Sequence, residues 1–153
     1  METETNGVAA WLMQIDRLTN LAVGQYELVH IVDQPEYTPI PQAPEYCKHV
    51  IIWNDNIVPV MNISSWVTGE VQPEDSGIVA ILVYKSPQEE FLYGGIKLSN
   101  TPVLERVNNN QQCALPESLA KLKLISISCF KSSDGDVVPI LDVTGLFSKK
   151  ISA

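Results

Sequence analysis

The chain has 153 residues, a hydrophobic fraction of 45%, a charged fraction of 18% and a formal net charge of −8. This length suffices for one domain that buries roughly 68–70% of the surface its unfolded chain would expose. The negative charge repels phosphate backbones and anionic lipid, which argues against nucleic acid and membrane surfaces as partners and favours protein.

The N-terminal segment and the cysteines indicate a cytoplasmic protein. The apolar run from Val8 to Met13 is too short for a membrane-spanning helix and has no basic lead, so we expect no direct membrane insertion. Cys47, Cys113 and Cys129 are odd in number and lack C-x-x-C spacing, which is typical of reduced thiols rather than of a disulfide framework.

The first third of the chain predicts extended structure. Residues 1–7 are polar and predict a flexible tail, and residues 8–15 fit either a strand or a helical turn. Residues 21–32 fit a strand that bends into a second strand or a short helix. Four prolines between residues 35 and 44 remove backbone donors and predict an extended connector.

A β-hairpin is expected over residues 50–61. Two apolar runs, 50–53 and 57–61, flank Asn54-Asp55-Asn56, and these residue types tolerate the positive φ of a tight turn. Pro59 lies in the second run, which predicts that this arm is an edge strand or contains a bulge.

The second half repeats this alternation of strands and turns. Its expected elements are a buried strand at 78–84, a turn at 86–90, a return strand at 91–98, a polar loop at 108–112, a helical turn at 116–121 and a strand at 122–130. The dipeptide Asp134-Gly135 then predicts a second tight hairpin.

Two segments of the chain resemble each other. Residues 56–67 (NIVPVMNISSWV) return as residues 136–147 (DVVPILDVTGLF), 80 positions later. This spacing is too long for a solenoid repeat and predicts two similar lobes within one domain. The repeated core positions are Val58, Pro59, Val60, Val138, Pro139 and Ile140.

Motifs for catalysis, cofactors and metals are weak. Cys47 and His49 would share one face of a strand, but His30 is the only other histidine, which is too few ligands for a zinc site. The sequence has no nucleophile elbow, phosphate-binding loop or dinucleotide fingerprint, and Gly94-Gly95 better fits a close strand crossing. We therefore predict no catalytic, cofactor-binding or metal-binding residue and no enzyme activity.

The proline connector and the hairpin after it resemble CheW-like proteins. Residues 38–51 (TPIPQAPEYCKHVI) are similar to the T-P-V-P-N-A-P stretch and following strand of that family, and the likeness continues through residues 57–63 and again at 137–146. The resemblance implies a mainly β fold with two small five-stranded SH3-like barrels around a shared hydrophobic core and few short helices.

The same resemblance implies the domain boundaries. We expect a single domain over residues 8–147, with lobes centred on about 20–67 and 76–147, and a C-terminal tail over 148–153.

Family membership would imply a non-enzymatic adaptor in chemosensory signal transduction. CheW-like proteins couple the cytoplasmic tips of chemoreceptors to the regulatory domain of a chemotaxis-type histidine kinase, and variants serve systems that control type IV pili and twitching. The turn associated with partner binding is Arg-Gly in the family and Asn54-Asp55 here. The protein-binding residues implied by the resemblance, on an altered turn, are Trp53, Asn54, Asp55 and Asn56.

Alternative interpretations stay open at this point. The turn at residues 54–56 fits a solvated turn chosen for its φ preferences as well as a recognition turn, and Trp53 fits a core aromatic or an interface anchor. The other class of function is an unrelated small β-barrel that binds a small molecule or hydrolyses one. Such a protein should have a deep pocket with convergent polar groups.

Overall fold

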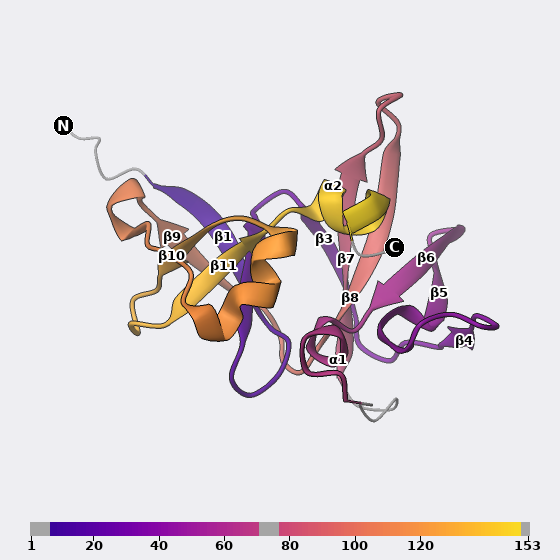
Figure 1. The fold of residues 1–153 in the computed structure, drawn as a ribbon. Coiled ribbons are helices and arrows are strands. Elements are labelled where there is room, and N and C mark those ends of the chain that lie inside the picture. Colours follow the sequence, from indigo (N-terminus) through magenta and orange to yellow (C-terminus); the bar gives the residue numbers. More distant parts are fainter. Residues whose placement is uncertain (1–6, 71–76, 151–153) are drawn as a thin grey trace.

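The computed structural model describes residues 7–70 and 77–150, so almost all of the predicted N-terminal tail lies outside the described residues. The described chain is mainly β, as predicted, and its strands form two sheets that lie side by side (Figure 1). No helix in the described parts of the chain is long and apolar enough to cross a membrane.

One sheet has five strands in the order β10-β11-β2-β1-β9. Its strands are β1 (Val8–Gln14), β2 (Asn20–Gly24), β9 (Val103–Val107), β10 (Ser126–Lys131) and β11 (Val137–Leu141). The other sheet has six strands in the order β3-β7-β8-β6-β5-β4. Its strands are β3 (Leu28–Val32), β4 (Thr38–Pro39), β5 (His49–Trp53), β6 (Asn56–Met61), β7 (Ile78–Lys85) and β8 (Phe91–Leu98).

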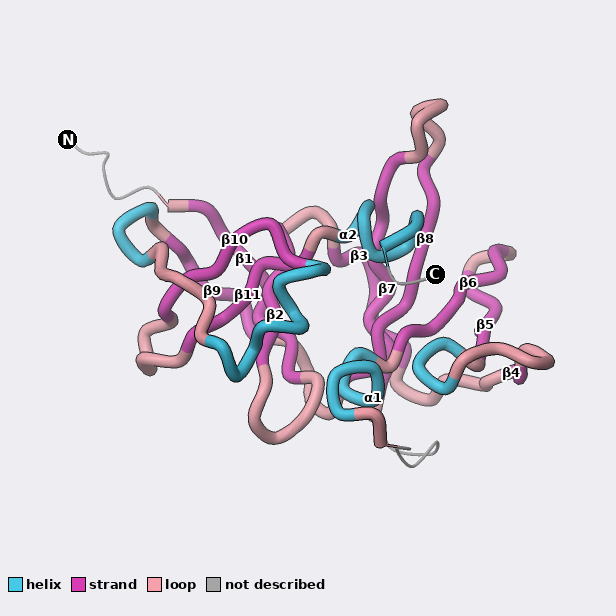
Figure 2. The backbone as a smooth tube through the Cα atoms, in the orientation of Figure 1, coloured by secondary structure: helices cyan, strands magenta, loops and turns pink. Residues whose placement is uncertain are grey.

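The helices are short. They are α1 (Ile63–Thr68), α2 (Val143–Gly145), and the single-turn or irregular segments η2 (Glu45–Cys47), η3 (Asn109–Gln111), η4 (Glu117–Ile125) and η5 (Leu146–Lys150). Figure 2 shows α1 and α2 where the two sheets meet. η5 includes residues 148–150 of the predicted C-terminal tail, and the rest of that tail lies outside the described residues.

The near-repeat corresponds to the same arrangement in both sheets. β6 forms an antiparallel hairpin with β5 and a short parallel ladder with β8, while β11 pairs in the same two ways with β10 and β2. Each strand then leads into a helix: the Asn62 side chain accepts a hydrogen bond from the Ser65 amide, and Asp142 accepts one from the Gly145 amide, both at 3.0 Å. The repeated polar residue is therefore a helix N-cap.

The two halves of the sequence exchange strands between the sheets. β1 and β2 pair with β9 and β11 from the second half, whereas β7 and β8 pair with β3 and β6 from the first. The predicted lobes at 20–67 and 76–147 therefore do not coincide with the two sheets. Because the two copies of the repeat contain similar strands, the sequence does not show whether a strand pairs within its own copy or with the other copy.

A central apolar cluster joins the sheets and forms the shared core. Met13 and Leu21 from the five-stranded sheet meet Leu82 and Ile96 from the six-stranded sheet there, and all four are fully buried. Two smaller clusters belong to one sheet each, and they contain the repeated valines Val58, Val60 and Val138. Pro139 is also buried, whereas Pro59 and Ile140 are half-buried.

The six-stranded sheet curls on itself. The His30 ring in β3 stacks on the Trp53 ring in β5 at 5.8 Å, although three strands separate β3 from β5 in the sheet order. The SH3-like description therefore suits the fold, but within the part of the chain that the structure describes no continuous ladder closes either sheet. The sixth strand, absent from the prediction, is the two-residue β4 in the proline connector.

Two element predictions are wrong in detail. Pro59 lies in an interior strand, and this position tolerates proline because the ladder between β6 and β8 covers only Val60 and Met61. The strand expected at 122–130 begins at Ser126, because the buried Leu122 and Ile125 belong to η4. The predicted hairpins at 50–61 and 78–98 and the turn at 132–135 are confirmed.

Candidate functional site

The turn between β5 and β6 has the backbone that a tight hairpin requires. Asn54 and Asp55 have φ values of +53° and +64°, and both side chains are exposed. Short polar side chains tolerate this left-handed conformation, whereas most others do not. The Asn56 amide Nδ2 donates to the Asn54 carbonyl oxygen at 3.0 Å, which holds the turn from within.

Trp53 supports the turn from the inner side of the sheet. It is half-buried against a cluster that includes Ile51 and Val58. Its ring packs edge-to-face on Tyr93 at 5.2 Å and stacks on His30. Trp53 thus packs β5 against β8 and β3 while part of its side chain stays exposed.

The outer face of the hairpin carries an apolar pair that the sequence interpretation missed. Ile52 and Ile57 lie directly opposite each other across β5 and β6, and they are 66% and 71% exposed. Their neighbours Ile51 and Val58 point to the buried side. The period of two along a strand was the available signal, but an unbroken β-branched and aromatic run hid which positions face outward.

An open cleft lies at the junction of the two sheets. It has a volume of about 250 Å³, and its lining includes Asp16, Arg17, Asn62 and Lys97. The Asp16 carboxylate accepts hydrogen bonds from the Ser64 hydroxyl at 2.8 Å and the Leu18 amide at 2.9 Å. The same Asn62 caps α1, so two of the polar groups in this cleft serve the local backbone.

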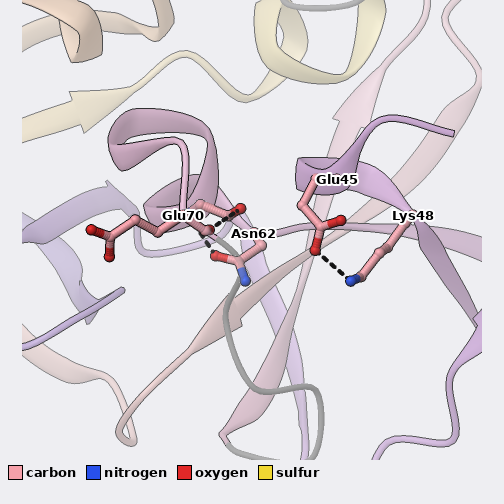
Figure 3. Close-up of polar contacts among 5 residues, drawn as sticks. Glu45, Lys48, Asn62 and Glu70 are labelled. Atoms are coloured by element: carbon pink, nitrogen blue, oxygen red, sulfur yellow. Dashed lines mark hydrogen bonds and ion pairs between the residues drawn. The ribbon is translucent and has the colours of Figure 1, made fainter.

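A second cavity of about 20 Å³ is large enough only for water. It lies beside the ion pair between Glu45 and Lys48, and Figure 3 shows this pair next to Asn62 at the start of α1. Neither of these two cavities is the deep pocket that the small-molecule interpretation predicts.

Cys47 and His49, which the sequence places on one strand face, lie in different elements of the structure. Cys47 ends η2 and His49 begins β5, where its ring packs against Tyr37 at 5.0 Å. Burial raises the pKa of the Cys47 thiol, which makes it a poorer nucleophile. Among the described residues, no group of three or more His, Cys, Asp or Glu side chains could hold a metal ion.

Comparisons with known proteins agree with this geometry. A model of the CheW-like domain matches residues 12–150. The crystal structure of the scaffolding protein TtCheW from Thermoanaerobacter tengcongensis is similar, with a TM-score of 0.71 and 12% sequence identity over 96% of this chain and 97% of that chain. At this identity the likeness shows the fold alone. A comparison with curated proteins found no match.

The family match spans both sheets, the repeated hairpins and the altered turn. The chain therefore belongs to the CheW-like domain family, and membership of this family implies a coupling adaptor in chemosensory signalling.

Proposed function

We propose that the chain couples the cytoplasmic tip of a chemoreceptor to the regulatory domain of a chemotaxis-type histidine kinase, and that the β5–β6 hairpin is a contact surface. Family membership supports the adaptor role. The observation that carries the location is an exposed isoleucine pair, Ile52 and Ile57, beside a turn with an exposed acidic residue, Asp55.

The hairpin has the physical properties of a protein contact. When a partner covers an exposed apolar pair, the free energy of binding becomes more favourable by roughly 25 cal/mol per Å² of apolar surface removed from water. The turn is already held by the Asn56 to Asn54 hydrogen bond and, from inside, by Trp53. Little conformational entropy is then lost when a partner binds.

The altered turn indicates a matched change in the partner. Where family members have Arg-Gly, this chain presents Asn54-Asp55, which removes a positive charge and adds a negative one. A partner surface suited to arginine would repel this turn, because like charges across an interface cost affinity. We infer that the cognate surface places a basic side chain opposite Asp55.

The test measures binding of the purified chain to two separate proteins, a receptor tip fragment and a kinase regulatory domain encoded in the same genome. Isothermal titration calorimetry of the wild type is compared with Ile52→Lys. The matched control is Ile127→Lys, since Ile127 is 68% exposed on β10 of the other sheet. We expect Ile52→Lys to weaken binding to at least one protein by about tenfold, while Ile127→Lys leaves the affinity unchanged.

Two outcomes would contradict the proposal. Equal affinities of the two variants would show that the hairpin is not part of the interface. Failure of the folded wild type to bind either protein would show that the chain does not couple them. If the bound kinase belongs to a type IV pilus system, the proposal extends to control of twitching.

A further inference from the structure

The five-stranded sheet contains a pair of thiols in contact. The Sγ atoms of Cys113 and Cys129 are 3.6 Å apart, and both residues are free cysteines. The Cys129 thiol donates a hydrogen bond to the Cys113 carbonyl oxygen at 2.8 Å. Cys47 packs against the central cluster in η2, and it has no thiol partner because the sequence has no fourth cysteine.

The backbone places these two residues opposite each other. Gln112 and Phe130 form an isolated antiparallel bridge, so Cys113 and Cys129 are the next pair along it, and the Cys113 amide donates to the Cys129 carbonyl at 3.2 Å. Directly opposed residues of antiparallel strands have Cα atoms about 4.5–5.5 Å apart, which lies within the range that a disulfide spans. To form a disulfide, the two sulfurs must approach from 3.6 Å to about 2.05 Å.

The pair also lies where the segment after β9 meets the edge strand β10. β9 and β10 are the two edge strands of the sheet, and the segment that follows β9 meets β10 at the isolated bridge between Gln112 and Phe130. Beyond the bridge, Gln111 Nε2 donates to the Lys131 carbonyl at 3.0 Å and Gln112 Nε2 donates to the Ser128 hydroxyl at 3.3 Å. A covalent link between Cys113 and Cys129 would join the segment after β9 directly to β10.

We propose that Cys113 and Cys129 are a reversible oxidation site, at which hydrogen peroxide converts the two thiols into an intramolecular disulfide while Cys47 stays reduced. The adaptor role does not require this site, and its test is independent of partner binding.

The reaction begins at Cys113. Cys113 is half-buried and can be reached by a small oxidant, whereas Cys129 is only 4% exposed. Burial, and then the hydrogen bond with Cys113, raises the pKa of Cys129 to about 11, so it is a thiol at neutral pH. The Cys113 sulfur attacks one peroxide oxygen, the O–O bond breaks, and the products are a sulfenic acid and water.

Cys129 then completes the disulfide. Its sulfur attacks the Cys113 sulfur, the S–O bond breaks, and the departing hydroxide takes the Cys129 proton as water. Overall, two thiols and one peroxide give one disulfide and two waters, and the two electrons lost by the sulfurs reduce the peroxide. Small thiols such as dithiothreitol reverse the reaction by exchange.

The test oxidises the folded full chain with a small excess of hydrogen peroxide, then alkylates it in denaturant for intact mass and peptide analysis. The reduced chain should take up three alkyl groups and the oxidised chain one, with a linked peptide pair containing Cys113 and Cys129. Oxidation should raise the Tm by on the order of 5 °C, and dithiothreitol should reverse this rise.

Two variants serve as controls. Cys47→Ser should still lose both remaining thiols on oxidation, whereas Cys113→Ser should keep its two thiols free. Cys113 is only half-buried, so its replacement should fold even if replacement of the buried Cys129 does not. Three alkylated thiols after peroxide treatment, a disulfide that contains Cys47, or a disulfide between two chains would each overturn the proposal.

Discussion

Asp55 tests the proposed interface at the scale of one residue. Asp55→Asn removes the charge and keeps a side chain that tolerates φ of +64°. Asp55→Arg reverses the charge and adds strain, which we expect to lower the free energy of unfolding by about 1 kcal/mol. If the partner surface is basic, affinity should fall modestly for Asp55→Asn and about tenfold or more for Asp55→Arg. Calorimetric Kd values and urea midpoints separate these two effects.

Salt dependence provides the control for this prediction. The difference in affinity between wild type and Asp55→Arg should shrink at high ionic strength, because an exposed charge pair is screened. The interface assignment fails if Asp55→Arg lowers the urea midpoint sharply while the folded variant binds its partner with unchanged affinity.

Gly94 shows how one missing side chain permits a close contact. A Cβ atom built at Gly94 would lie 2.3 Å from the Phe147 ring, which itself stacks on Tyr84 at 5.6 Å. We expect Gly94→Ala to displace this ring and to destabilise the fold by about 1–3 kcal/mol, measured by urea unfolding. The control is Gly24→Ala in β2, where the nearest atom to the new Cβ is 3.4 Å away.

A double-mutant cycle identifies the cause. In a Phe147→Ala background, Gly94→Ala should cost much less than it does in the wild type, since the clashing ring is gone. Equal costs in both backgrounds would show that the Phe147 ring is not what excludes a side chain at Gly94.

At the scale of elements, β11 is the strand on which the five-stranded sheet depends. Val138 is fully buried there beside Phe130, and Val138→Asp would place an unpaired carboxylate in that cluster. We expect a loss of about 4 kcal/mol or more and the loss of cooperative melting. Val103→Asp in β9 of the same sheet, 62% exposed, should change the Tm little. Retained cooperativity and Tm in Val138→Asp would contradict the core assignment.

Local chemistry explains which elements the sequence predicts well. The turn at Asn54-Asp55 and the turn at Asp134-Gly135 were predictable, because their residue types alone permit the backbone that a hairpin needs. The start of β10 at Ser126 was not, because the apolar residues Leu122 and Ile125 suit a strand and a buried helical turn equally. The outward direction of Ile52 depends on register with Ile57, which is a tertiary property.

At the scale of the whole molecule, the exchange of strands makes the two halves depend on each other. Each sheet takes a two-stranded hairpin from one half, β1–β2 or β7–β8, and its remaining strands from the other. The central cluster likewise draws Met13 and Leu21 from one half and Leu82 and Ile96 from the other. The repeat predicts two contiguous lobes, but the hairpins β1–β2 and β7–β8 are each completed into a sheet by strands from the other half of the chain.

This dependence predicts the behaviour of separated halves. Fragments covering residues 1–72 and 73–153 should each lack a cooperative thermal transition, since neither contains a complete sheet. Mixed at equal concentration, they should recover the near-ultraviolet circular dichroism of the intact chain, with a Tm that rises with concentration because the refolded species is a complex. A mixture of the first fragment with a Val138→Asp second fragment is the control and should stay unfolded. A cooperative transition in either fragment alone would show that one half folds independently and that the exchange is not required for stability.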